Sequence, residues 1–408
     1  MTSVSRRLLR HLVFFFILIS FLVLCNANTA ANLQIIRESG ISYSGNTTWG
    51  SSKFVKNNNI DYFTECAMLS TGAINTKSEN ALVSTFNPQS ILSCDDLTNL
   101  VAFGIIPTAS PQSLDVGLKQ DGRFWHGYQI ITKPLLSLGG VKYLQIGTLL
   151  CALWFNLSFL QVSIKKLKAN SLFVLLPYLI SFNLNQFFLF SHLLPVAIPM
   201  AMTIRLMNRD FKFDSSDLVD MFFYGFYWVF FCFLINPILV LSIPAATYVV
   251  FSEMNKTSAL KRVKELAKII LLTSTGMVTS VFIKVGTVGF LTGRWSKNLE
   301  GSSYWNNHIK FGTAISNTVW ANNKYIFLVS VIAVIAFCSS RSQPTNRFFY
   351  VLIVVIGLVY PWFLPSHTVH TWASGSAWPF NFAVLVSLRA LLNPIIGENS
   401  MVSHIRTN

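Results

Sequence analysis

Two acidic residues, Asp61 and Glu65, are four positions apart in a polar stretch near the start of the chain. Residues with this spacing share one face of a helix, so a helix here would place the two carboxylates side by side. A carboxylate held beside a hydroxyl can remove its proton as a general base. Asp61 is equally suited to cap the start of a helix, with Glu65 as an ordinary solvated acid. Glu38, earlier in the same stretch, is a further candidate base.

The sequence Arg-Phe-Trp-His-Gly-Tyr at residues 123–128 is a second candidate site. The guanidinium of Arg123 can bind a phosphate through two charge-assisted hydrogen bonds, and the imidazole of His126 can hydrogen-bond a phosphate or a sugar. Trp125 and Tyr128 carry the amphipathic rings that gather at membrane interfaces. A belt of interface aromatics with one anchoring arginine explains the same residues, so both interpretations stay open.

Four more polar candidates lie in or beside later apolar segments. Lys284 lies inside such a segment, where an ionisable residue usually indicates a functional role. The alternative is that its flexible side chain extends to the membrane interface and places the charge there. Arg294 follows in the next polar loop. His367 and His370, three apart, could hydrogen-bond a sugar or phosphate, ligate a metal or form a plain turn. No metal cluster or glycine-rich phosphate loop stands out, so the sequence predicts neither a metal nor a cofactor.

Cys66 and Cys94 are the cysteines of the first polar stretch. In an oxidising compartment they could form a disulfide that closes this stretch. Their spacing does not determine connectivity, so a disulfide and two free thiols both remain open.

The composition indicates a membrane protein. Hydrophobic residues make up 52% of the chain, charged residues only 12%, and the mean hydropathy is +0.51. A soluble domain has about a quarter charged residues. Apolar segments about 20 residues long are separated by short basic stretches, which is the pattern of transmembrane helices with cytoplasmic basic loops. The net charge of +15 is therefore assigned to these loops, and nucleic acid is not expected as a partner.

These patterns predict an all-α polytopic membrane protein with about ten transmembrane helices and both termini cytoplasmic. Residues 1–408 would form a single membrane domain. Residues 26–141 would form a large first extracytoplasmic loop bearing short amphipathic helices, and residues 291–324 a second extracytoplasmic loop. The predicted spans are residues 11–25, 142–164, 171–190, 192–207, 218–235, 238–251, 269–290, 325–338, 348–364 and 379–392.

Three arginines precede the first span and place the N-terminus inside. Residues 25–27 loosely match a small-x-small cleavage site, so a cleaved signal peptide is the alternative. Short loops and compact length favour a bacterial inner membrane, with the active site on the periplasmic side. Glycosylation sequons at Asn46 and Asn255 keep the endoplasmic reticulum open as a second location.

An acidic residue outside the first helix, followed by an amphipathic run that ends in Leu-x-x-Gly, resembles the first outer loop of the GT-C glycosyltransferases. In this chain the pattern covers residues 61–72. The GT-C enzymes are polytopic and take a sugar from a polyprenyl-phosphate donor. The resemblance implies that Asp61 is the general base. Because Asp61 lies well beyond the end of the first helix, where the family places its acid next to that helix, Glu38 remains a rival.

The resemblance implies an inverting glycosyltransferase that transfers a sugar from a polyprenyl-phosphate donor to a hydroxyl of an extracytoplasmic glycan, lipid or protein. Arg123, together with Lys284 or Arg294, would neutralise the lipid phosphate while Asp61 deprotonates the acceptor. Membrane lipid is a further expected partner.

Two other functions remain open. One is an O-antigen-type polysaccharide polymerase or ligase, which usually carries its large outer loop late in the chain. The other is a transporter or flippase of lipid-linked sugars, which would have no chemistry of its own. Transporters tend to be built from repeats with charges at mid-membrane, and this sequence shows no internal repeat.

Overall fold

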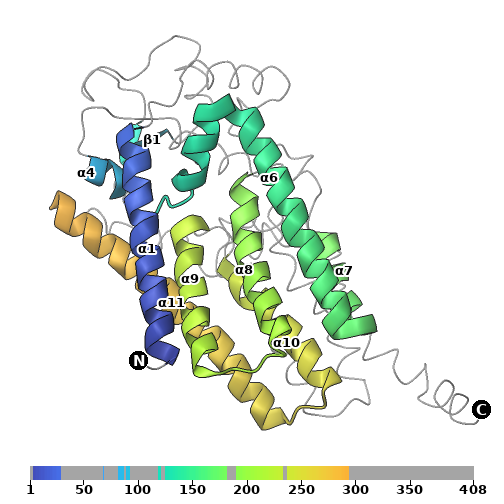
Figure 1. Cartoon of the computed structure of the whole chain (residues 1–408). Coiled ribbons are helices and arrows are strands. Elements are labelled where there is room, and N and C mark those ends of the chain that lie inside the picture. The colour runs from blue at the N-terminus through green and yellow to red at the C-terminus, as the bar shows by residue number, and fades with distance from the viewer. Residues whose placement is uncertain are drawn as a thin grey trace, which may run out of the picture.

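The computed structural model describes residues 3–28, 68, 81–86, 89–91, 118–120, 125–181, 190–232 and 237–293, and these form a bundle of helices (Figure 1). Its long helices are α1 (Ser3–Asn28), α6 (Gln129–Leu167), α8 (Phe190–Asn208), α9 (Ser215–Cys232), α10 (Pro237–Met254) and α11 (Ala259–Thr292). Shorter helices are α4 (Ala81–Phe86), η1 (Lys168–Ser171) and α7 (Leu172–Ser181).

The helices follow the apolar runs of the sequence. Each of the seven spans predicted before residue 291 coincides, over its described residues, with a helix. Within the described residues, the segments Ser3–Ala27, Lys142–Leu176 and Leu260–Thr292 are long and apolar enough to cross a membrane. The spans predicted at residues 325–338, 348–364 and 379–392 lie outside the described residues.

The described residues are helical, as predicted, apart from one short two-stranded ribbon. Strands β1 (Gln89–Ile91) and β2 (Leu118–Gln120) pair antiparallel, with Ser90 opposite Lys119. Both strands belong to the predicted first loop, which also contains the short helix α4. Pairing gives the backbone groups of each strand the hydrogen-bond partners that an extended segment needs.

Helix α6 begins earlier than the predicted second span and is broken in the middle. It starts at Gln129, whereas the segment suited to cross a membrane starts at Lys142. Between them, Gly139 and Gly140 depart from helical backbone angles. Gly140 has a φ of 68°, a conformation that favours glycine. The predicted loop boundary at residue 141 therefore falls inside α6, and residues 129–138 form a separate helical piece before the break.

Three helices of the bundle keep large apolar side chains on their outer faces. Phe16 of α1, Trp154 of α6 and Phe282 of α11 are 67%, 64% and 72% exposed. Contiguous exposed apolar surface of this kind marks contact with lipid or protein. The segments suited to cross a membrane lie in α1 and α11 and run from α6 through η1 into α7, so these exposed faces fit contact with lipid tails.

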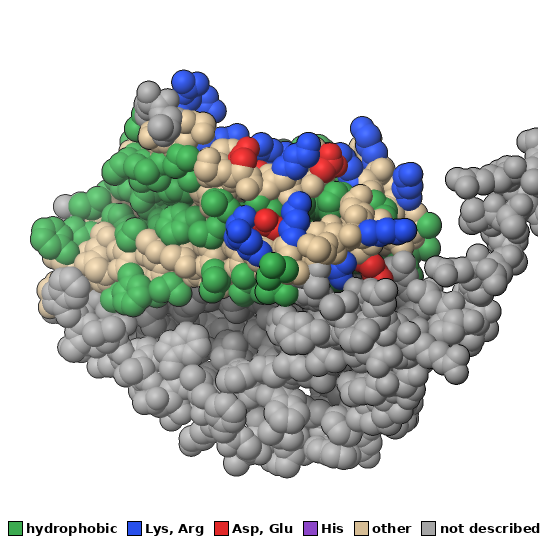
Figure 2. Space-filling model, turned by 90° about the horizontal axis from the view of Figure 1, so that it is seen from below, with side chains coloured by type: hydrophobic (Ala, Val, Ile, Leu, Met, Phe, Trp, Pro, Cys, Tyr) green, Lys and Arg blue, Asp and Glu red, His purple; other side chains and the backbone are tan. Residues whose placement is uncertain are grey.

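Basic residues gather at one end of the bundle. The N-terminus of α1, the C-terminal end of α6 and the α8–α9 and α10–α11 connections all lie at this end, which is at the bottom of Figure 1. Figure 2 looks onto it and shows Lys and Arg side chains spread across the described surface. We call it the basic end. The start of α6, the C-terminus of α1 and α4 lie at the opposite end.

Candidate functional site

Four of the predicted site residues are described, and they lie together at the end of the bundle opposite the basic end. These are Trp125, His126, Tyr128 and Lys284, all of them buried. The other predicted residues lie outside the described residues, and their roles stay predictions. They are Glu38, Asp61, Glu65, Cys66, Cys94, Arg123, Arg294, His367 and His370.

Residues 125–128 form a turn that docks onto the end of α9. The backbone N–H of Gly127 donates a hydrogen bond to the carbonyl oxygen of Phe230 at 3.0 Å. A Cβ atom on Gly127 would lie 2.3 Å from the Phe230 ring and 2.6 Å from its carbonyl oxygen. Only a residue without a side chain allows this approach. The glycine therefore fixes where the turn, and the helix α6 that follows it, meet α9.

Trp125 connects this turn to four helices, α1, α4, α9 and α11. Its indole Nε1 donates to the carbonyl oxygen of Ser280 on α11 at 2.8 Å. Its ring packs at centroid distances of 5.9 Å against Phe15 of α1, 5.7 Å against Phe86 of α4 and 5.3 Å against Phe230 of α9. The indole is enclosed by aromatic side chains instead of being presented at the surface. Packing of this kind gives the turn a fixed position in the bundle.

His126 and Tyr128 form a buried polar pair within the same turn. The imidazole Nδ1 of His126 lies 2.7 Å from the hydroxyl of Tyr128, a hydrogen-bonding distance. The two rings are 1% and 0% exposed. A tyrosine hydroxyl and an imidazole can each donate or accept, so the pair can pass a proton or hold a polar ligand group.

Lys284 is fully buried on α11 and points at the same turn. Its ammonium donates to the carbonyl oxygen of Phe86, the last residue of α4. It also lies 5.4 Å and 5.3 Å from the ring centroids of Phe86 and Trp125, which is cation–π distance. Snorkelling to the membrane interface, one of the two predicted explanations, does not describe this side chain, because its charge stays inside the protein.

Three further buried polar residues, which no sequence motif singles out, complete this end. The ammonium of Lys133 donates to Oδ1 of Asn26 at 2.6 Å, and Nδ2 of Asn26 donates to Oε1 of Gln129 at 3.2 Å. Burial lowers the pKa of Lys133 to about 8. Gln129 and Lys133 are four apart and so share a helix face, a signal hidden by their position in a predicted loop. The polar core of this end comprises Asn26, His126, Tyr128, Gln129, Lys133 and Lys284.

The polar core contains two buried ammonium groups, that of Lys284 beside the Phe86 and Trp125 rings and that of Lys133 bonded to the amide oxygen of Asn26. In the part of the chain that the structure describes, no acidic side chain contacts Lys133. An ammonium in such a setting favours an anionic ligand, because a nearby negative charge offsets its loss of hydration. The described residues contain no group of three or more His, Cys, Asp or Glu side chains arranged to hold a metal ion.

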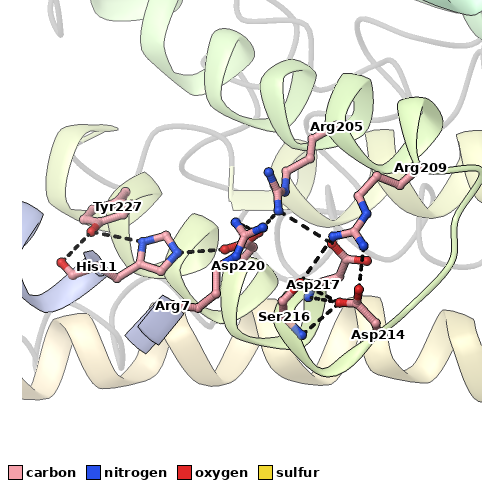
Figure 3. Close-up of polar contacts among 9 residues, drawn as sticks. All are labelled: Arg7, His11, Arg205, Arg209, Asp214, Ser216, Asp217, Asp220 and Tyr227. Carbon is pink, nitrogen blue, oxygen red and sulfur yellow. Dashed lines mark hydrogen bonds and ion pairs between the residues drawn. The ribbon is translucent and has the colours of Figure 1, made fainter. Parts of the chain in front are cut away.

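A second polar cluster, at the basic end, connects α1, α8 and α9 through ion pairs (Figure 3). Acidic and basic side chains alternate along it. Composition alone assigns these arginines to loops, whereas the aspartates beside an apolar segment are the signal that indicates the cluster. We call this cluster the charged network, and its members are Arg7, His11, Arg205, Arg209, Asp214, Asp217 and Asp220.

Asp220 is the centre of the charged network. Its carboxylate lies 3.1 Å from the guanidinium of Arg7 and 2.8 Å from Nε2 of His11, and it also contacts Arg205. His11 stacks on Phe223 with ring centroids 4.3 Å apart. Since Asp220 is on α9 and two of its partners are on α1, this carboxylate attaches the first helix to the bundle.

Asp214 and Asp217 form the other half of the charged network. Asp214 caps α9, because its carboxylate accepts hydrogen bonds from the backbone N–H groups of Ser216 and Asp217 at 2.9 Å and 3.0 Å. The Ser216 hydroxyl, those backbone bonds and Arg209 hold the pKa of Asp214 at about 2. Arg209 also contacts the buried carboxylate of Asp217 at 2.6 Å. The turn between α8 and α9 is thereby fixed by its own side chains.

Helix α1 is thus bonded at both of its ends, and we expect it to remain in the mature protein. Cleavage near residue 27 would take Arg7 and His11 from Asp220 and Asn26 from Lys133. Trypsin cuts after residues 10 and 37, so mass spectrometry should recover the peptide of residues 11–37 from purified protein. Peptides that begin only at residues 26–28 would show that α1 is removed as a signal peptide.

Comparison of the chain with protein-family models, with curated proteins and with solved structures gives no match. The assignment of a function therefore depends on the chemistry of the polar core, the charge distribution and the resemblance of the first loop. A site is a sounder basis for such an assignment than a helical fold, because one fold supports many functions.

Proposed function

We propose that the protein is a membrane glycosyltransferase that moves a sugar from a polyprenyl-phosphate donor to a hydroxyl of an extracytoplasmic acceptor. The observation that carries this proposal is the convergence of the 125–128 turn with Lys284 at one end of the bundle. Buried lysine charge beside aromatic rings suits a lipid phosphate and the sugar attached to it. The GT-C resemblance of residues 61–72 supports the same chemistry.

The charge distribution supports the orientation that this function needs. Cytoplasmic loops of membrane proteins carry an excess of Lys and Arg. The basic end would then face the cytoplasm, and the polar core would face the outside, which in a bacterial inner membrane is the periplasm. A lipid-linked donor exposed on that side would reach the polar core from the bilayer. Asp61 would act there as the general base, and Arg123 would help Lys284 to bind the phosphate.

A transfer assay tests this function directly. Membranes containing the full chain are given a polyprenyl-phosphate sugar with a labelled sugar, and we expect label to appear on a glycan, lipid or protein. Asp61→Asn should lower the rate about a hundredfold, within the range of general-base catalysis. Glu79→Gln, in the same predicted loop, serves as the control and should keep the rate. Label that never leaves the donor would refute the proposal.

A carrier of lipid-linked sugars is the second candidate, because a buried ionisable residue within a span is typical of transport pathways. The two functions differ in where the label goes. A carrier would move the labelled donor across vesicle membranes and leave the sugar–phosphate bond intact. Protection of the label from an added, membrane-impermeant phosphodiesterase would report this movement.

A further inference from the structure

The basic end carries many cations that have no acidic partner. Eight exposed lysines and arginines at this end form no ion pair within the described part of the chain. They come from the start of α1, the end of α6, η1, the α8–α9 connection, the α10–α11 connection and the start of α11. Together they are Arg6, Arg10, Lys165, Lys168, Lys212, Lys256, Lys261 and Lys264.

Acidic residues at the same end do not cancel this charge, because most of them are already paired. Asp210 contacts Lys166 at 2.7 Å, and Glu265 contacts Lys268 at 2.9 Å. Asp214, Asp217 and Asp220 are occupied by the arginines of the charged network. The surface that remains is positive, and the blue side chains of Figure 2 spread across it. We therefore expect the partner of this surface to be anionic.

The position of α11 indicates which anionic partner this is. The helix has 34 residues and spans about 51 Å, whereas the hydrocarbon core of a bilayer is about 30 Å thick. Its basic first turns therefore extend into the headgroup layer. There Leu260 is 82% and Val263 45% exposed, next to Lys261 and Lys264. Exposed apolar residues among lysines are typical of segments that lie in a membrane interface.

We propose that the basic end binds the headgroup phosphates of anionic phospholipids, with Lys256, Lys261 and Lys264 as its principal contacts. The apolar side chains of Leu260 and Val263 enter the acyl boundary while the lysines reach the phosphates. An acidic soluble protein would meet the positive charge but would leave these two apolar residues in water. This inference is independent of the proposed enzymatic function.

The test compares lipids on the full chain purified in a neutral detergent. Phosphatidylglycerol should raise the melting temperature by several degrees, and phosphatidylcholine should not. In a titration followed by native mass spectrometry, the triple variant K256S/K261S/K264S should bind phosphatidylglycerol about a hundredfold more weakly. Lys142→Ser, an exposed lysine at the opposite end, is the matched control and should bind it as the wild type does.

Four outcomes would overturn the inference. Full phosphatidylglycerol binding by the triple variant would remove these lysines from the contact. An equal rise in melting temperature with soluble glycerol phosphate would mean that free phosphate is the ligand, and a rise with polyglutamate alone would indicate an acidic protein. If the triple variant has a lower melting temperature than the wild type in phosphatidylcholine, the substitutions have destabilised the fold and the comparison of variants is replaced. The replacement test measures how phosphatidylglycerol binding by the wild type depends on salt. This binding should weaken steeply between 50 and 500 mM salt, and salt-independent binding would refute the proposal.

Discussion

Gly276→Ala is expected to separate α11 from α9 and to lower the free energy of unfolding by more than about 3 kcal/mol. A Cβ atom at residue 276 would lie 1.9 Å from the carbonyl oxygen of Phe222. That oxygen belongs to the backbone of α9, so it cannot rotate away as a side chain would. In the same crossing, a Cβ on Gly225 would lie 2.0 Å from the carbonyl oxygen of Thr273. Both glycines are needed for the two backbones to meet.

Gly286→Ala is the matched control for this prediction, because it makes the same substitution ten residues further along the same helix. In the part of the chain that the structure describes, nothing outside the helix's own backbone lies within 4 Å of a Cβ at residue 286. Alanine should there stabilise α11 slightly, by up to about 1 kcal/mol, through its higher helix propensity. Urea or thermal unfolding in detergent measures both variants. Equal stability of the two would show that α9 and α11 do not cross as closely as the structure has them.

Asp220→Asn is expected to lower the free energy of unfolding by about 3–5 kcal/mol, because it leaves the cations around a buried carboxylate uncompensated. Only 6% of the Asp220 side chain is exposed, and Arg7, His11 and Arg205 all contact it. The loss of stability should be largest at the contact of α1 with α9. Limited protease digestion of the protein in detergent would report it as faster cutting near residues 6–10.

Asp210→Asn provides the comparison for the Asp220 variant. Asp210 also forms an ion pair, with Lys166 at 2.7 Å, but its side chain is 50% exposed. Exposed pairs contribute at most about 1 kcal/mol, since water screens the charges and both side chains lose entropy. Unfolding curves should therefore place Asp210→Asn close to the wild type. A similar loss of unfolding free energy in both variants would mean that water screens the ion pairs of the charged network.

The positions of the helices could be predicted from the sequence because apolar runs are a local signal. The start of α6 could not, since Pro134, Gly139 and Gly140 read as loop residues when their neighbours are unknown. Here tertiary contacts outweigh local preference: the 125–128 turn is docked on α9, and the helix begins directly after it.

The sites were predictable only in part. Trp125, His126, Tyr128 and Lys284 were chosen from their types and their nearness to span ends, and they do lie together in space. The pairs that organise both ends could not be found in this way. Arg7 and Asp220 are 213 residues apart, and Asn26 and Lys133 are 107 apart, so no local pattern connects them.

The attachment of α1 at both ends has a consequence for biogenesis. Ribosomes add about 5–20 residues per second, so roughly 10–40 s separate the synthesis of Arg7 from that of Asp220, 213 residues later. During this interval the start of α1 lacks its carboxylate partner, whereas Asn26 at its other end can already bond Gln129 and Lys133 of α6, which follow 103 and 107 residues later. Insertion of α9 is then the step that closes the assembly, and a chain truncated before it should expose α1 to quality-control proteases.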